Sequence, residues 1–114
     1  MNLNNSKKKI ATNITLNNML EYIDEHINEP ITITNLADYS YLSQSRIAHM
    51  FTYNLHISVQ KYINRKKMIY AHNLIKNGFK PTKVAISLGY DNYSTFYRLY
   101  KKYINANPQI KIQI

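Results

Sequence analysis

The sequence contains no cysteine, and this absence excludes disulfide bonds and metal sites built on thiolates. Only two glycines and three prolines occur in 114 residues, which leaves little of the turn chemistry that a multi-stranded sheet requires. No apolar run approaches the roughly 18 residues of a membrane-spanning helix, and no apolar signal segment follows the three lysines near the start. We therefore expect an all-helical chain that neither spans a membrane nor carries an export signal.

Acidic residues are scarce, and the charges are unevenly placed along the chain. Residues 1–38 hold three lysines against five acids, a net charge of −2, whereas residues 39–114 hold twelve Lys or Arg against the single acid Asp91, a net charge of +11. A field of this sign attracts polyanions, of which nucleic acid is the first candidate and an anionic membrane surface the second. The membrane alternative is weaker, because the apolar residues are needed for a helical core.

The residue patterns of enzyme sites are missing. The four histidines show no metal-ligand spacing, no nucleophile is paired with a base, and no glycine-rich loop could hold a phosphate. We expect a protein that is not an enzyme, with no metal, no cofactor and no small-molecule site in these residues. The eleven tyrosines also suggest stacking on single-stranded nucleic acid, but several of them fall on apolar helix faces.

The stretch 58–77 predicts a long central helix. It contains no Gly or Pro, Ser58 can serve as its N-cap, and Gly78 follows where a left-handed residue is typical. Further helices are expected at 13–28, from Thr32 or Thr34 to about residue 40, and at 44–53. Two more should begin at residue 81 and after residue 91 or 92, the last one ending near residue 103. The segments 1–13 and 109–114 are expected to be a flexible basic start and a tail.

The segments on either side of the central helix look like two versions of one unit. Leu36-Ala37 precedes a tight turn and the i, i+4 pair Ile47 and Phe51; Val84-Ala85 precedes Gly89 and the pair Phe96 and Tyr100, offset by 48 or 49 residues. A short helix, a tight turn and an anchored second helix form the helix-turn-helix plan. The fold expected is all-α, with helix-turn-helix subdomains at 14–57 and 78–108 joined by a long central linker helix at 58–77.

These stretches resemble the DNA-binding domain of the AraC/XylS-type transcription regulators. The resemblance covers about residues 16–108 and rests on LADYSYLSQSRIAHMF (36–51), YINRKKMIYAHNLI (62–75) and VAISLGYDNYSTFYRLYKKYINANP (84–108). The third segment is specific, because it follows the family signature in order from Gly89 to Pro108. The resemblance implies two helix-turn-helix units whose second helices can enter adjacent major grooves on one face of DNA.

Several positions depart from the family pattern. His56 stands where glycine is usual before the linker helix, so either the loop differs or His56 adopts a positive φ. Tyr41 replaces a commonly small residue of the first turn. Lys67 stands where the linker helix usually has arginine, so a bidentate contact there is lost. His49 and Thr52 replace basic residues that are usual in the first reading helix, which lowers the expected affinity of the first unit.

The faces opposite the two anchored pairs are the candidate DNA-binding residues. On the first recognition helix they are Gln44, Ser45, Ala48, His49 and Thr52, and on the second they are Tyr93, Ser94, Tyr97, Arg98, Lys101 and Lys102. We expect sequence-specific binding of double-stranded DNA by a transcription regulator, cytoplasmic and nucleoid-associated, with RNA polymerase as a further candidate partner. The alternative is a protein-interaction module of the same fold that binds a regulator or RNA polymerase through its basic face.

Overall fold

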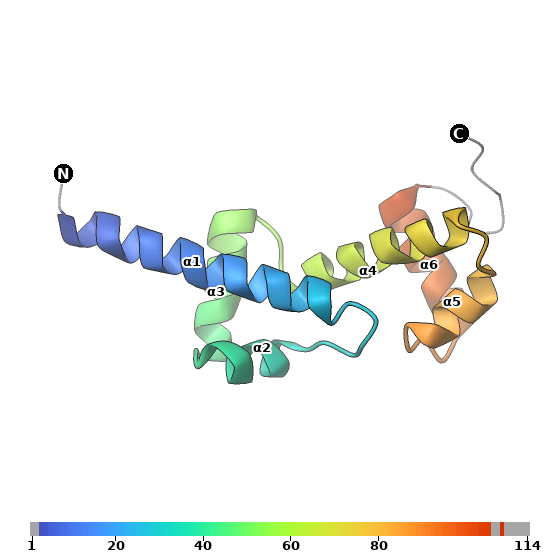
Figure 1. The fold of residues 1–114 in the computed structure, drawn as a ribbon, viewed down its shortest axis with the longest axis horizontal. Helices are drawn as coiled ribbons and strands as arrows, with labels where there is room; N and C mark the ends of the chain where they lie inside the picture. Colours follow the sequence, from blue (N-terminus) through green and yellow to red (C-terminus); the bar gives the residue numbers. More distant parts are fainter. Residues whose placement is uncertain (1–2, 106–107, 109–114) are drawn as a thin grey trace. The chain divides into compact units, whose positions relative to one another are not determined.

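The computed structural model describes residues 3–105 and residue 108, and the secondary structure among them is entirely helical (Figure 1). The helices are α1 (Leu3–Glu25), α2 (Ile33–Ser40), α3 (Gln44–Leu55), α4 (Val59–Lys76), α5 (Pro81–Ser87) and α6 (Tyr93–Ile104). The expected all-α class is thus confirmed. The segment 109–114, which was expected to form a tail, lies outside the described residues.

Helix α1 begins at Leu3, well before the predicted start at residue 13. The prediction followed the apolar periodicity, which starts only at Leu16, a residue that is buried. The preceding turns contain no Gly or Pro, the two residues that oppose a helix most strongly, and they include three lysines and an alanine that favour one. The predicted helix start was therefore wrong, and the flexibility of residues 1–13 stays a prediction.

The other helix starts follow local chemistry that the sequence shows. The Ser43 hydroxyl accepts a hydrogen bond from the Arg46 backbone N–H at 3.1 Å, and the Ser58 hydroxyl accepts one from the Lys61 N–H at 3.2 Å. Pro81 occupies the first turn of α5, where the missing N–H has no helical partner to lose. These three predicted helix starts are confirmed, because a cap depends only on residues within one turn.

Two alternatives for capping α2 and two for capping α6 are now resolved. Thr32, rather than Thr34, caps α2 in a reciprocal arrangement: its hydroxyl accepts from the Asn35 N–H at 3.2 Å, while the Asn35 side-chain oxygen accepts from the Thr32 N–H at 2.8 Å. Asn92 caps α6, its side-chain oxygen accepting from the Ser94 N–H at 2.7 Å. Together with Ser43 at the start of α3, Asn92 gives both second helices of the expected helix-turn-helix units a side-chain cap.

The chain forms two compact units. Among the described residues, the first unit comprises 3–26 and 31–62, and the second comprises 27–30, 63–105 and 108. The division falls within α4, so the first turn of this helix belongs to the first unit and the remainder to the second. In the first unit, α2 and α3 pack on each other and both contact α1 (Figure 1).

Each unit contains its own buried apolar residues. Those of the first unit are Leu16, Met19, Ile23, Ile31, Leu36, Ile47, Met50, Phe51, Val59 and Tyr62. In the second unit a single cluster consists of Met68, Ala71, Val84, Ala85, Leu88, Phe96 and Tyr100. Both anchoring pairs of the sequence repeat are among them, which confirms that the two second helices are seated through the predicted residues.

Candidate nucleic-acid interface

The outward face of α3 is set by the residues that hold this helix in place. Ile47 and Phe51 are 0% exposed and Met50 is almost completely buried, so the opposite side of the helix must face solvent. All five predicted residues of the first recognition helix are exposed: Gln44, Ser45, Ala48, His49 and Thr52. They form a polar face with hydrogen-bonding groups and one small apolar side chain, the set of groups that reads base edges.

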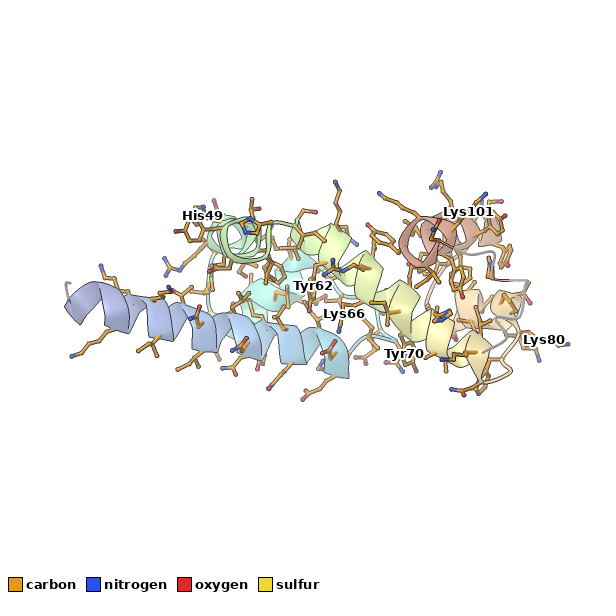
Figure 2. All side chains as sticks on the ribbon, turned by 90° about the horizontal axis from the view of Figure 1, so that it is seen from above. His49, Tyr62, Lys66, Tyr70, Lys80 and Lys101 are labelled. Atoms are coloured by element: carbon orange, nitrogen blue, oxygen red, sulfur yellow. The ribbon has the colours of Figure 1, made fainter. Side chains whose placement is uncertain are left out.

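Contacts with neighbouring side chains orient two members of this face. The Gln44 amide donates to the Thr34 hydroxyl of α2 at 3.1 Å, which links the start of α3 to the preceding helix. The His49 ring stacks on Tyr53, one helical turn further on, with centroids 5.7 Å apart and planes inclined by 19°. Figure 2 shows His49 on the outside of α3. The face is therefore partly ordered before any ligand arrives.

Two further exposed side chains border this face and were not predicted as site residues. Arg46 and Tyr53 lie between this face and α1, and both line a groove between α1 and α3 together with His49. Arg46 is the one basic residue of α3. The helical wheel contained the signal for both, because positions 46 and 53 flank position 49 on one side.

The outward face of α6 is built in the same way and is more basic. Phe96 and Tyr100 are buried, and the Tyr100 hydroxyl is 2.8 Å from His72 Nδ1 of α4, which fixes the inner side of α6. On the opposite side the predicted residues Ser94, Arg98, Lys101 and Lys102 are exposed, while Tyr93 and Tyr97 are half-buried. Figure 2 shows Lys101 pointing away from α6. The four exposed residues thus lie on the solvent side of this helix, while Tyr93 packs against the core at the border of that side.

Aromatic contacts constrain part of the α6 face. The Tyr93 ring lies 5.8 Å from the buried Phe96 ring and 6.4 Å from that of Tyr97, so Tyr93 connects the core to the Tyr97 ring. The Lys102 ammonium lies 5.3 Å from the centroid of the Tyr103 ring, a cation–π distance. Arg98 and Lys101 are thus the basic residues of this face that project from its centre, and Lys102 lies at its edge.

Lys67 does not belong to the exposed face of α6. It stands at the position where the family pattern has an arginine, and where the sequence predicts that a bidentate contact is lost. It is 8% exposed, and its ammonium donates to the backbone carbonyl of Glu29 at 3.0 Å, within the second unit. Burial lowers the pKa of the Lys67 ammonium below its usual value, because desolvation disfavours the charged form. The single hydrogen bond agrees with the expected loss of a bidentate contact and assigns Lys67 to holding the segment before α2.

His56 adopts the positive φ that was one of the two expectations. It ends α3 in the left-handed conformation, with φ of 57°, and its backbone N–H donates to the Thr52 carbonyl at 3.1 Å. Tyr41 adopts the same conformation in the turn before α3, with φ of 58°. The backbone path that glycine usually permits is therefore kept without glycine at both positions.

Other kinds of site find no support in the described part of the chain. No helix there is long and apolar enough to cross a membrane. No group of three or more His, Asp or Glu side chains within residues 3–105 could hold a metal ion.

Comparison with known proteins shows the family. The helix-turn-helix domain family matches residues 36–110. The chain is 29% identical over 91 residues to the regulatory protein SoxS of Salmonella typhimurium, covering 79% of this chain and 85% of SoxS. It is 25% identical over 93 residues to an uncharacterized response regulatory protein of Staphylococcus epidermidis, covering 82% of this chain but only 37% of that protein.

A solved structure shows the same fold. It is that of a probable AraC family transcriptional regulator from Rhodopseudomonas palustris, with a TM-score of 0.75 and 27% sequence identity, and the match covers 82% of this chain and 90% of that one. The family match, the relatives and this structure agree with the all-helical helix-turn-helix fold. The chain belongs to the AraC/XylS-type family of DNA-binding transcription regulators, as a DNA-binding domain of that family.

Proposed function

We propose that this chain binds double-stranded DNA sequence-specifically, with α3 and α6 as recognition helices in adjacent major grooves. The observation that carries the proposal is that both second helices are anchored by a buried i, i+4 pair and expose a polar or basic face. An α-helix fits the major groove, where each base pair presents a distinct pattern of hydrogen-bonding groups.

The side chains of α6 suit both base reading and phosphate binding. Arg98 carries a planar guanidinium that can donate two hydrogen bonds to guanine O6 and N7. Lys101 and Lys102 are exposed point charges suited to phosphates, which position the protein without specifying sequence. Tyr93 and Tyr97 can donate their hydroxyls to phosphates or pack against sugars. This helix is therefore expected to supply most of the electrostatic affinity.

The face of α3 is better suited to reading bases than to holding the backbone. Gln44 can pair with adenine N6 and N7, and the Ala48 methyl can contact a thymine methyl. Ser45, His49 and Thr52 supply further hydrogen-bonding groups. The linking helix α4 has 18 residues, about 27 Å of helix, which is of the order of the ~34 Å between successive major-groove faces.

The test compares two variants of α6 on specific and random duplexes. The specific duplex is first obtained by selecting bound sequences from a random library. Arg98→Ala should then weaken specific binding by about 1–3 kcal/mol, whereas Lys102→Ala should weaken binding to all sequences alike and reduce the salt slope by about one. Equal losses from both variants on both duplexes would contradict the assigned roles.

The salt dependence of the unmodified chain tests the proposal as a whole. Duplex binding should weaken steeply between roughly 50 and 200 mM salt, because phosphate contacts release counterions. If no duplex is bound at low salt while RNA polymerase or another regulator is retained, the chain is a protein-interaction module of the same fold and the DNA proposal fails.

A further inference from the structure

A basic groove lies in the first unit, between the N-terminal half of α1 and α3. Three cationic side chains line it, Lys8 and Lys9 from α1 and Arg46 from α3, and none of its described lining residues is acidic. A second hollow shares Lys8 and Arg46 with it and extends the depression along α1 toward Thr15. The groove exists because α1 begins at Leu3, so its first turns carry the lysines alongside α3.

The groove is continuous with the reading face of α3. His49 belongs both to the exposed face of α3 and to the lining of the groove, and Tyr53, stacked on His49, lines the groove too. Any duplex contacted by His49 would therefore pass the mouth of this groove. The α3 face itself offers little charge, since Arg46 is the one basic residue on this helix.

We propose that this groove binds the phosphate backbone of the same duplex, just beyond the base pairs that α3 reads. The inference rests on the proposed function and adds a third contact region to it. The lysines supply cationic donors, and Thr12, Asn13 and Asn54 in the lining supply neutral ones, a mixture that suits a run of phosphates. Lys8, Lys9 and Arg46 are all exposed, as expected for a surface that meets an extended polyanion rather than an enclosed small anion.

The same helix provides a matched control. Lys7 is exposed and adjacent to Lys8, but it does not line the groove. Lys7→Gln and Lys8→Gln remove one charge each at neighbouring positions, and glutamine has nearly the helix propensity of lysine, so α1 should stay helical in both. The double variant Lys8→Gln/Lys9→Gln removes two groove lysines at once and should therefore lose more DNA affinity than Lys8→Gln alone.

The experiment measures the affinity of each variant for two duplexes that carry the selected sequence, one with about ten flanking base pairs and one trimmed to the site. On the long duplex the double variant should bind roughly tenfold more weakly at low salt, with a salt slope reduced by about two. Lys8→Gln should bind more weakly than Lys7→Gln. On the trimmed duplex the unmodified chain and the double variant should bind equally, because the flanking phosphates are gone.

Other outcomes separate this inference from the function on which it rests. If the lysine variants bind the long duplex as well as the unmodified chain does, while Arg98→Ala still weakens binding, the groove contact is wrong and DNA recognition stands. If Lys7→Gln and Lys8→Gln lose the same affinity for the long duplex, the lysines act as diffuse charge and the groove assignment fails. If the unmodified chain binds neither duplex, both proposals fall together.

Discussion

The two helix-turn-helix units both place a residue with positive φ after their first helix, but they use different residue types. Tyr41 and Gly89 occupy matching places between the paired helices, 48 positions apart, and both have positive φ, 58° and 88°. Glycine adopts this conformation freely, whereas an L-residue with a side chain is opposed by about 1–2 kcal/mol. Tyr41 is 95% exposed, so packing of its side chain contributes little stability to offset the unfavourable φ. A positive φ at this position is thus common to both units, and glycine is only the residue that adopts it most easily.

The second helices of the two units, α3 and α6, also differ in charge. The described part of α6 presents Arg98, Lys101 and Lys102, whereas α3 presents only Arg46 and otherwise neutral polar groups. The first unit gains its additional cations from the early turns of α1, and the second carries them on the recognition helix itself. A basic face can therefore be assembled from one helix, as in the second unit, or from two, as in the first unit. Only the one-helix arrangement can be recognised in a single stretch of sequence.

The largest expected effect tests whether the units fold independently. Phe51→Ala and Phe96→Ala each remove an aromatic ring that is 0% exposed, and each should lower the free energy of unfolding by about 3–5 kcal/mol. Denaturation followed by fluorescence of the tyrosines measures the loss. Since the two rings lie in different units, footprinting should show that each variant loses only the contacts of its own half. Loss of the whole footprint in both variants would mean that the units do not fold separately.

A change of charge sharpens the comparison of the recognition helices. His49→Arg places a permanent cation on the exposed face of α3 and should raise affinity for random duplex DNA by about 1 kcal/mol, with a steeper salt slope. The gain should be smaller for Ser94→Arg on α6, where three cations already act. If the two variants gain the same affinity for random duplex DNA, the lower positive charge of α3 does not limit its binding and the comparison fails. Filter binding or fluorescence anisotropy at several salt concentrations provides the measurement.

Exchange of the turn residues should give effects of opposite sign. Gly89→Ala should destabilise the fold by about 1 kcal/mol through its positive φ alone, because a Cβ at that position meets no atom within 4 Å. Tyr41→Gly should stabilise the first unit by about 0.5 kcal/mol, since relief of the strained φ exceeds the added entropy of the unfolded chain. Thermal or chemical unfolding measures both. A loss of stability in Tyr41→Gly would show that the Tyr41 side chain makes a contribution that its exposure conceals.

Features that depend on neighbouring residues could be predicted from the sequence. One helical turn of residues is enough to predict the caps at Ser43 and Ser58 and the place of Pro81 in the first turn of α5. The repeat predicts the buried pair Phe96 and Tyr100. The exposure of the predicted recognition faces follows in turn, because burying one side of a helix leaves the other outside. Their DNA contacts remain predictions.

Features that depend on distant or aperiodic partners could not be predicted. The first turns of α1 lack an apolar period, so nothing in the local pattern distinguished a helix from a frayed segment, and the groove with Arg46 was missed with it. The burial of Lys67 depends on a backbone carbonyl 38 residues away, and a backbone group leaves no trace in a sequence pattern. The exposure of Arg46 itself could have been predicted, because position 46 lies beside position 49 on the helical wheel.

The smallest expected effect concerns the pH dependence of stability. The described groups with shifted pKa values all belong to the second unit. Burial lowers the pKa of Lys67 from 10.5 and raises those of Tyr90 and Tyr100 from 10.0, with Tyr103 and Tyr93 adding smaller contributions in the same direction for the two tyrosines. Between its lowered folded-state pKa and 10.5, Lys67 binds fewer protons in the folded state than in the unfolded state. Its contribution to stability therefore rises with pH across that window, while the tyrosines make stability fall above pH 10.

Comparison with Lys67→Met isolates the lysine, because the tyrosines are present in both proteins. At pH 7 the variant should differ in stability by no more than about 1 kcal/mol, since loss of the hydrogen bond to Glu29 opposes relief of the buried charge. As pH rises toward 10.5, the unmodified protein should gain stability relative to the variant. Unfolding at several alkaline pH values measures the difference, and a pH-independent difference would mean that Lys67 keeps its ordinary pKa. Leu16→Ala, which removes no titratable group, should show no such dependence and so serves as the control that assigns the effect to Lys67.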